Sequence, residues 1–313
     1  MMSAAPLELG GPEIPDAPSV MARAGGENFP VAAHVLSRRH RRHLLSVYGF
    51  ARLADDLGDE LAGDRLAALD WLERELDRAY AGQARHPLLL SLQGTLAECP
   101  LPRAPFVRLI DANRLDQRVT RYETWEQLRS YCELSANPVG ELVLCVFALA
   151  TPERIALSNQ VCTALQLVEH LQDLGEDMRR GRVYLPAEDL VRFGCSVEQL
   201  AVLVCKGDPD LDLRGAPSSS PSPHGDCERS AARLREVVSF ETSRARELLT
   251  GGVPLLRGVG GRPRLALAAF VAGGRAALEQ IEHASFDVLG GATRASRPRR
   301  VGALLRLLAE SRG

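Results

Sequence analysis

The sequence has almost no net charge and almost no lysine. It carries 38 Lys and Arg against 40 Asp and Glu, a formal net charge of -2 at pH 7, and Lys206 is its only lysine. Without a basic field to attract nucleic acid, any anion-binding site must be a local feature. We therefore expect no nucleic-acid partner.

Paired cysteines, membrane-length apolar runs and nucleotide-binding loops are also missing. The seven cysteines are scattered without a CxxC pair, which argues against a disulfide framework or a zinc site and favours a reducing cytosol. No window is long enough for a membrane span, and the N-terminal stretch has no basic segment followed by an apolar one. The seven histidines lack metal-site spacing, and no glycine pair forms a phosphate loop. These absences predict a cytoplasmic protein.

Helical periodicity is what the chain does contain. Hydrophobic residues make up 45% and aromatic residues 5%, and no stretch alternates as a strand would. We predict an all-α fold in a single domain over residues 26–313, after a flexible lead-in at 1–25 and with a disordered insert at 207–226, where Pro, Ser, Gly and Asp are dense. The predicted helices cover 44–61, 66–80, 105–117, 125–149 with an interruption at Asn137-Pro138, 152–177, 227–250, 264–284 and 300–310.

Two aspartate pairs carry the chemistry that the sequence suggests. Asp55 and Asp59 are four residues apart on one predicted helix, and Asp173 and Asp177 are four apart on another. Such spacing stacks two carboxylates on one helix face, where like charges destabilise the helix by about 0.2–0.5 kcal/mol. Oxygen ligands suit Mg²⁺, which is usually completed by phosphate oxygens, so the pattern predicts magnesium and a diphosphate substrate. The alternative is a pair of solvated acidic faces offset by neighbouring arginines.

Three blocks of sequence also carry a resemblance. They are GENFPVAAHVLSRRHRRHLLSVYGFARLADDLGDE at 26–60, YCELSANPVGELVL at 131–144 and LQLVEHLQDLGEDMRRGRVYLP at 165–186. In order and spacing they resemble the squalene/phytoene synthase family over roughly residues 26–310. Within that family, the first block most resembles the hydroxysqualene synthases of the bacterial hopanoid pathway.

The resemblance implies an isoprenoid synthase helical bundle with a central cavity and about two or three Mg²⁺ ions that assist loss of diphosphate. For the hydroxysqualene branch, it implies conversion of presqualene diphosphate and water to hydroxysqualene and diphosphate, without NADPH. It further implies functional coupling to a presqualene diphosphate synthase and to a downstream flavin-dependent reductase.

The resemblance also implies roles for individual residues. Asp55, Asp59, Asp173 and Asp177 match the metal ligands, and Arg52 and Arg182 match residues that contact the diphosphate. The positions at the reacting end match Tyr131, Tyr48 and Tyr184, of which Tyr131 steers the cationic steps. The other substrate-binding positions match Gln166, Asn28, Phe29 and the small residues that leave room for prenyl chains, Ala136, Val139 and Gly140.

Three positions depart from the condensing relatives. Glu169 stands where these usually have a metal-site Asn, Gln172 where they usually have an Arg on the diphosphate, and Asn28-Phe29 where they have a Ser-Phe opening. Losing an Arg removes a bidentate phosphate contact, which favours processing one diphosphate over condensing two. Ordinary variation within the condensing branch is the alternative, so a head-to-head prenyl transferase making squalene, dehydrosqualene or phytoene stays open.

Two further alternatives concern partners. A non-catalytic family member acting as an assembly or lipid-binding factor is a third hypothesis, although both aspartate pairs are intact. The basic run at 38–42 is either a solvated helix start or a peripheral contact with anionic lipid at the inner face of the membrane.

His170 is expected to be a core or capping histidine.

Overall fold

The computed structural model describes residues 14–22, 36–206, 225–289, 302–304 and 306–307. Within these ranges the secondary structure is helical, and the only β-type pairing is an isolated bridge between Arg121 and Val183. The helices are α1 (Ala17–Ala22), α3 (Arg38–Asp59), α4 (Arg65–Tyr80), α5 (Pro87–Leu96), α6 (Arg103–Asp116), α7 (Trp125–Ser135), α8 (Asn137–Val146), α9 (Pro152–Gln172), α10 (Leu174–Arg179), α11 (Ala187–Arg192), α12 (Val197–Lys206), α13 (Gly225–Gly252), the 3-10 helix η2 (Val253–Leu256) and α14 (Gly261–His283). The all-α prediction is confirmed.

Helix α3 begins where the sequence offers a capping residue. The Ser37 side chain accepts a hydrogen bond from the backbone N–H of His40 at 3.2 Å. The buried apolar residues of α3 follow the helical period: Leu44, Val47, Phe50, Leu53 and Leu57. Because α3 ends at Asp59, both aspartates of the first pair lie in its last two turns.

Two expected long helices are each divided in two. The break between α7 and α8 falls at Ala136, just before Asn137 and Pro138, where the interruption was predicted. The helix expected over 152–177 starts as predicted, with Thr151 accepting from the backbone N–H of Arg154 at 3.3 Å, but ends at Gln172. Asp173 has φ -101° and ψ 10° and separates α9 from α10. The single-helix prediction was therefore wrong at this point.

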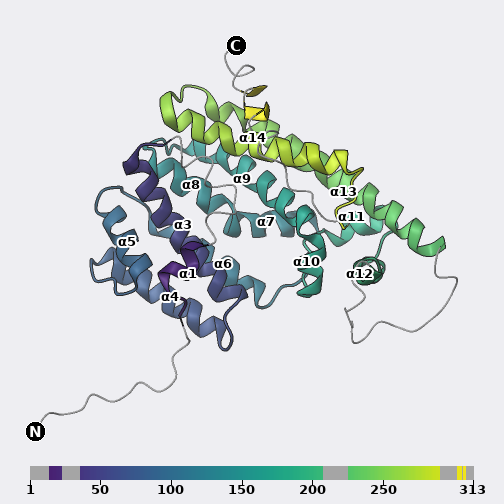
Figure 1. Cartoon of the computed structure of the whole chain (residues 1–313), viewed down its shortest axis with the longest axis horizontal. Coiled ribbons are helices and arrows are strands. Elements are labelled where there is room, and N and C mark those ends of the chain that lie inside the picture. Colours follow the sequence, from purple (N-terminus) through teal and green to yellow (C-terminus); the bar gives the residue numbers. More distant parts are fainter. Residues whose placement is uncertain (1–13, 23–35, 207–224, 290–301, 305, 308–313) are drawn as a thin grey trace, which may run out of the picture.

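The helices form a bundle in which α3 and α9 are the central members. Helix α3 packs against α4, α5, α6 and α8, whereas α9 packs against α7, α8, α13 and α14. Figure 1 shows α13 and α14 running together along one side of the bundle, over α8 and α9. Helix α3, which carries the first aspartate pair, and α9, which leads to the second pair, are thus joined through α8, which contacts both.

Two apolar clusters hold these helices together. The larger one includes residues from α3 to α9 and from α13 and α14, with Phe50 and Phe106 packed edge-to-face at 4.9 Å between ring centroids. The smaller one joins α10, α11 and α12 to the first half of α13, through Leu174, Leu190 and Leu200. Because α10 belongs to the smaller cluster and α9 largely to the larger one, the second aspartate pair lies where the two clusters meet.

The predictions for the N-terminal lead-in, the helix boundaries and the insert agree with the structure only in part. The expected lead-in contains α1, which is capped by Asp16 accepting from the Ser19 backbone N–H at 2.9 Å and buries Val20. Helices α5, α11 and α12 were not predicted. Residues 207–224 of the expected insert lie outside the described residues, as does most of the helix expected at 300–310. None of the described helices is both long and apolar enough to cross a bilayer.

Candidate active site

The first aspartate pair lies against the C-terminal half of α6. Asn113 donates from Nδ2 to Asp55 Oδ1 at 3.2 Å, and Gln117 donates from Nε2 to the backbone oxygen of Gly58 at 2.9 Å. A Cβ atom at Gly58 would come within 2.8 Å of the Asn113 Cγ, so glycine is what lets α6 approach α3 here. Asn113 was not among the predicted site residues.

The Asp55 side chain is exposed to solvent, yet it lies close to α6 and to Glu169 of α9. Desolvation raises its pKa to about 7, and the negative charges of Asp59 and Glu169 act in the same direction. The hydrogen bond from Asn113 and the charge of Arg52 lower the pKa but do not cancel the desolvation. Asp55 is therefore close to half protonated at neutral pH, and Glu169 of α9 is near enough to affect it.

The second pair also contains a carboxylate that is costly to ionise. Asp177 lies in α10 and keeps a helical hydrogen bond from its backbone N–H to the Asp173 oxygen at 2.8 Å. Desolvation, followed by the charge of Asp173, raises the pKa of Asp177 to about 7, although Arg182 and Arg180 oppose the shift. The helix break at Asp173 thus leaves the two carboxylates close enough to interact.

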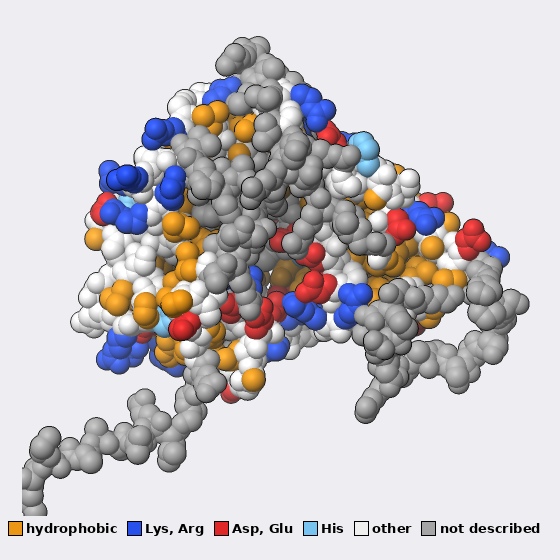
Figure 2. Space-filling view, in the orientation of Figure 1, with side chains coloured by type: hydrophobic (Ala, Val, Ile, Leu, Met, Phe, Trp, Pro, Cys, Tyr) orange, Lys and Arg blue, Asp and Glu red, His pale blue; other side chains and the backbone are white. Residues whose placement is uncertain are grey.

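Arg182 joins the two pairs. Its Nη2 lies 2.7 Å from Asp59 Oδ1, and its backbone N–H donates to the Asp177 oxygen at 2.9 Å. Arg180 approaches Asp59 as well, at 3.9 Å from Oδ2. Because both arginines follow α10 directly, the end of α3 and the segment after α10 converge on one site. Figure 2 shows acidic and basic side chains side by side around a hollow near the middle of this face.

Arg52, one turn before Asp55, forms ion pairs along its own helix. Its Nη2 lies 2.9 Å from Asp56 Oδ1 and 3.4 Å from Glu60 Oε1. Tyr48, four residues earlier, is buried on the same helix face as Arg52 and Asp55. The predicted diphosphate contact of Arg52 and the predicted catalytic role of Tyr48 stay predictions, and the structure places both beside the first pair.

Tyr131 and Tyr184, which are far apart in the sequence, meet at one buried carboxylate. The Tyr131 hydroxyl donates to Asp116 Oδ2 at 2.8 Å, and the Tyr184 hydroxyl donates to Asp116 Oδ1 at 3.0 Å. Asp116 ends α6 and was not predicted as a site residue. The sequence contains one indication that Asp116 belongs to the site. Asn113 and Asp116 are three residues apart and therefore place two polar groups on the same, buried face of α6.

A histidine completes this aromatic group. The His170 ring stacks on Tyr184 at 4.1 Å between centroids, and its Nε2 lies 3.0 Å from the Gln166 Nε2, which can only donate. Burial lowers the pKa of His170 to about 3, so the ring is neutral. Tyr122 packs against both Tyr131 and Tyr184. His170 is a core histidine, as expected, but one that contacts predicted site residues.

The other predicted substrate-binding residues lie on α7 and α8 or outside the described part of the chain. Ala136 is buried at the α7–α8 break and Val139 is half-buried. A Cβ atom at Gly140 would lie 2.5 Å from the Cys162 Sγ, so a small residue here serves close packing of α8 on α9. That is a different reason from the expected space for a prenyl chain. Asn28 and Phe29 fall outside the described residues.

The acidic residues suit a magnesium ion by their chemistry. Within the described ranges, no three His, Cys, Asp or Glu side chains stand as a ready-made metal cage. Mg²⁺ seldom needs one, because it keeps several waters and binds through one or two carboxylates plus substrate phosphate. Desolvation is the main cause of the raised pKa values of Asp55 and Asp177, so both carboxylates are costly to ionise without a nearby counter-ion. A divalent cation at these carboxylates would supply that counter-ion.

The comparisons with known proteins agree with this geometry. The family model described as squalene/phytoene synthase matches residues 22–301. Hydroxysqualene synthases of Rhodopseudomonas palustris and Sinorhizobium fredii are both 39% identical, over 67% and 56% of this chain and 72% and 60% of their own lengths. The 15-cis-phytoene synthase of Synechococcus elongatus is 33% identical over 56% of this chain and 61% of its own.

Solved structures show the same similarity. The crystal structure of squalene synthase HpnC from Alicyclobacillus acidocaldarius is 41% identical, covers 85% of this chain and 92% of its own, and superposes with a TM-score of 0.73. A dehydrosqualene synthase superposes with a TM-score of 0.75 over 95% of both chains at 23% identity, which speaks for the fold alone.

Proposed function

The chain belongs to the squalene/phytoene synthase family, and from that premise we propose that it converts presqualene diphosphate and water to hydroxysqualene and diphosphate. Hydroxysqualene synthases are among its similar relatives at 39% identity, and the solved squalene synthase HpnC shares 41%. Enzymes that make phytoene are similar too, at 33% identity, so family membership alone leaves the reaction open. The choice between water capture and condensation therefore rests on the residues of the site.

The observation that carries the proposal is the gathering of acidic side chains at one site, where the ends of α3 and α10 converge on Arg182 and Glu169 lies near Asp55. Glu169 lies close enough to Asp55 to raise its pKa, and Gln172 brings no positive charge to the same helix. Relative to the Asn and Arg that condensing relatives usually have there, each exchange makes the site one formal charge more negative. A site of this kind favours cations over a second diphosphate, which supports processing of a single diphosphate.

The proposal gives each residue of the site a separate role. Asp55, Asp59, Asp173 and Asp177 would hold Mg²⁺, which stabilises the charge that develops on the departing diphosphate. Arg182 binds Asp59 and is positioned to turn to the diphosphate.

The tyrosines act at the other end of the reacting bond. The resemblance assigns the control of the cation to Tyr131, beside Tyr184, and both rings are fixed by burial and by Asp116. A water molecule would then add to the cation and lose a proton to the released diphosphate, which gives the alcohol without a nicotinamide reductant.

The condensing reaction is the second candidate. It is supported by the similarity to phytoene synthases and by both intact aspartate pairs. The test is to incubate the purified full chain and Mg²⁺ with presqualene diphosphate, and separately with farnesyl diphosphate, without NADPH, and to identify the extracted lipids by mass spectrometry. Hydroxysqualene from the first substrate alone supports the proposal. Presqualene diphosphate or a C30 hydrocarbon from farnesyl diphosphate supports condensation.

The proposal has consequences for partners. A presqualene diphosphate synthase must supply the substrate, and a flavin-dependent reductase is the expected consumer of hydroxysqualene. Both substrate and product partition into lipid, so contact with the inner face of the membrane is part of the proposal. Arg39 and Arg42 are exposed at the start of α3, but both pair with Glu98, which reduces the charge that they offer to a lipid headgroup.

A further inference from the structure

Asp116 is the buried group that the predicted machinery does not include. It closes α6, is 8% exposed, and accepts hydrogen bonds from Tyr131 at Oδ2 and from Tyr184 at Oδ1. Burial of a carboxylate costs free energy unless its oxygens are hydrogen-bonded, and here each oxygen has one phenol. Arg182, which binds Asp59, also acts on Asp116 through its charge. Asp116 thus lies between the aspartate pairs and the tyrosines.

The chemistry of a carboxylate fixes the direction of both hydroxyl groups. An ionised carboxylate can only accept hydrogen bonds, so Tyr131 and Tyr184 must both donate to it. The two hydroxyls also lie close enough to interact with each other, and the lone pairs of each phenol oxygen that this contact leaves can accept from other groups. An amide in place of the carboxylate offers one accepting and one donating atom, so one of the two hydroxyls would have to turn and accept.

The rings themselves have little freedom. Tyr184 stacks on His170 with an interplanar angle of 9°, and Tyr131 lies 5.4 Å from Tyr184 between centroids. The backbone before and after Tyr184 is held too, because Val183 donates to the Thr120 oxygen at 2.8 Å and Ala187 to the Tyr122 oxygen at 2.9 Å. With the rings fixed, rotation of the two O–H bonds is the freedom that remains, and Asp116 removes it.

We infer that Asp116 is a positioning residue that holds the hydroxyls of Tyr131 and Tyr184 with both oxygens acting as acceptors toward the reacting prenyl chain. The inference rests on the proposed function. Two fixed acceptor oxygens stabilise positive charge nearby and can accept a hydrogen bond from the water that attacks it. Asp116 itself touches neither substrate nor metal in this role. It acts only through the two phenols.

The test is Asp116→Asn in the full chain, with Asp111→Asn as the matched control. Asp111 is on the same helix and pairs with Arg114 at 2.9 Å, away from the tyrosines. With presqualene diphosphate and Mg²⁺, we expect Asp116→Asn to lower kcat about 10- to 100-fold, to change KM about threefold or less, and to divert part of the product to other C30 compounds. We expect the control to match the wild type.

A double-variant comparison shows whether Asp116 acts through the tyrosine. In a Tyr131→Phe background, Asp116→Asn should cost much less than it does alone, because the hydroxyl that it positions is already absent. Costs that simply multiply would overturn the inference, as would an Asp116→Asn enzyme with wild-type kcat and product.

A measurement without substrate separates this inference from the proposed function. In ultraviolet resonance Raman spectra, the tyrosine doublet reports whether a phenol donates or accepts a hydrogen bond. Tyr131→Phe and Tyr184→Phe should each remove a strong-donor component from the spectrum of the five tyrosines, and Asp116→Asn should convert one donor to an acceptor. Loss of a weak-donor or acceptor component instead would overturn the inference. The wild-type product alone decides the proposed function.

Discussion

Asp177→Asn is expected to make the metal-free protein more stable at pH 8. Burial and the neighbouring Asp173 raise the pKa of Asp177 from 3.8 to about 7, so the folded state favours the neutral form more than the unfolded state does. Three pKa units correspond to about 4 kcal/mol once the carboxylate is fully ionised. Because the side chain is half-buried, solvent screening reduces the expected gain to about 1–2 kcal/mol.

The sign of the pH dependence follows from the raised pKa. Above about pH 7 the folded protein bears the full penalty of ionising Asp177, and the penalty disappears as pH falls toward 3.8. The advantage of Asp177→Asn over the wild type should therefore be largest at pH 8 and fall by half or more at pH 5. Both proteins are compared by thermal unfolding in a chelator at the two pH values, with an expected rise in Tm of about 2–8 °C at pH 8.

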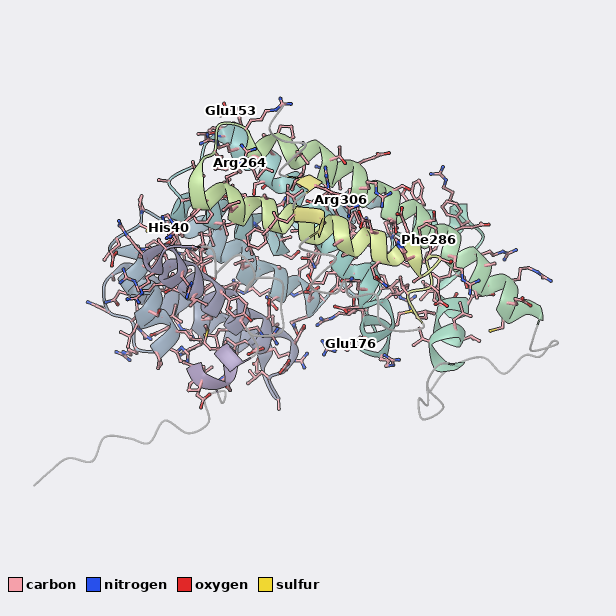
Figure 3. All side chains as sticks on the ribbon, turned by 45° about the horizontal axis from the view of Figure 1, so that its top comes forward. His40, Glu153, Glu176, Arg264, Phe286 and Arg306 are labelled. Carbon is pink, nitrogen blue, oxygen red and sulfur yellow. The ribbon has the colours of Figure 1, made fainter. Side chains whose placement is uncertain are left out.

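Glu176→Gln is the control for this experiment. Glu176 is exposed on α10, next to Asp177, and forms an ion pair with Arg180 at 2.9 Å. Figure 3 shows it projecting from α10 at the lower edge of the molecule. Removing this charge should change stability by about 0.5 kcal/mol or less. If Asp177→Asn is no more stable than Glu176→Gln at pH 8, the reasoning on the cost of ionising the partly buried Asp177 is wrong.

Three further predictions follow from the site. Asp55→Asn and Asp173→Asn should each abolish Mg²⁺-dependent turnover while leaving the circular dichroism unchanged, and activity equal to the wild type in either variant would rule out the metal assignment. Mg²⁺ affinity, measured by calorimetry, should weaken as pH falls from 8 to 6, because protons compete for Asp55 and Asp177, both with a pKa of about 7; affinity independent of pH would contradict this. Gly58→Ala should cost about 1–3 kcal/mol in denaturant unfolding and displace Asn113 from Asp55, whereas Gly94→Ala, with open space at its Cβ, should stabilise the protein slightly; equal effects would refute the packing argument.

Local signals predicted most of the helices and the two acidic motifs. Thr151 caps α9 and Pro138 interrupts a helix, so those boundaries depend on residues close together in the sequence. Ser37 caps α3 in the same way, although the helix was predicted to begin only at residue 44. The break at Asp173 has only a weak local signal, Gly175 in the first turn of α10, and depends on how α10 packs into the smaller apolar cluster. Helix α5 was missed because its five leucines do not follow a clear helical period.

The sequence predicts the part of the site that consists of a repeated motif. It does not predict the part in which single residues from distant segments come together in the fold. Asp55/Asp59 and Asp173/Asp177 are recognisable as pairs, and the resemblance adds Arg182 to them. Asn113 and Asp116 are isolated polar residues on α6, and their partners, Asp55, Tyr131 and Tyr184, come from three other parts of the chain. Only the tertiary arrangement reveals that they hold the functional side chains.

The central claim is that water ends the reaction of a single prenyl diphosphate, and isotope labelling tests it directly. The full chain is incubated with presqualene diphosphate and Mg²⁺ in water enriched in oxygen-18, without NADPH. The account predicts hydroxysqualene that carries one heavy oxygen atom in each molecule, with unlabelled carbon–oxygen bonds in the remaining substrate. A hydrocarbon product, or an alcohol without the label, would contradict it.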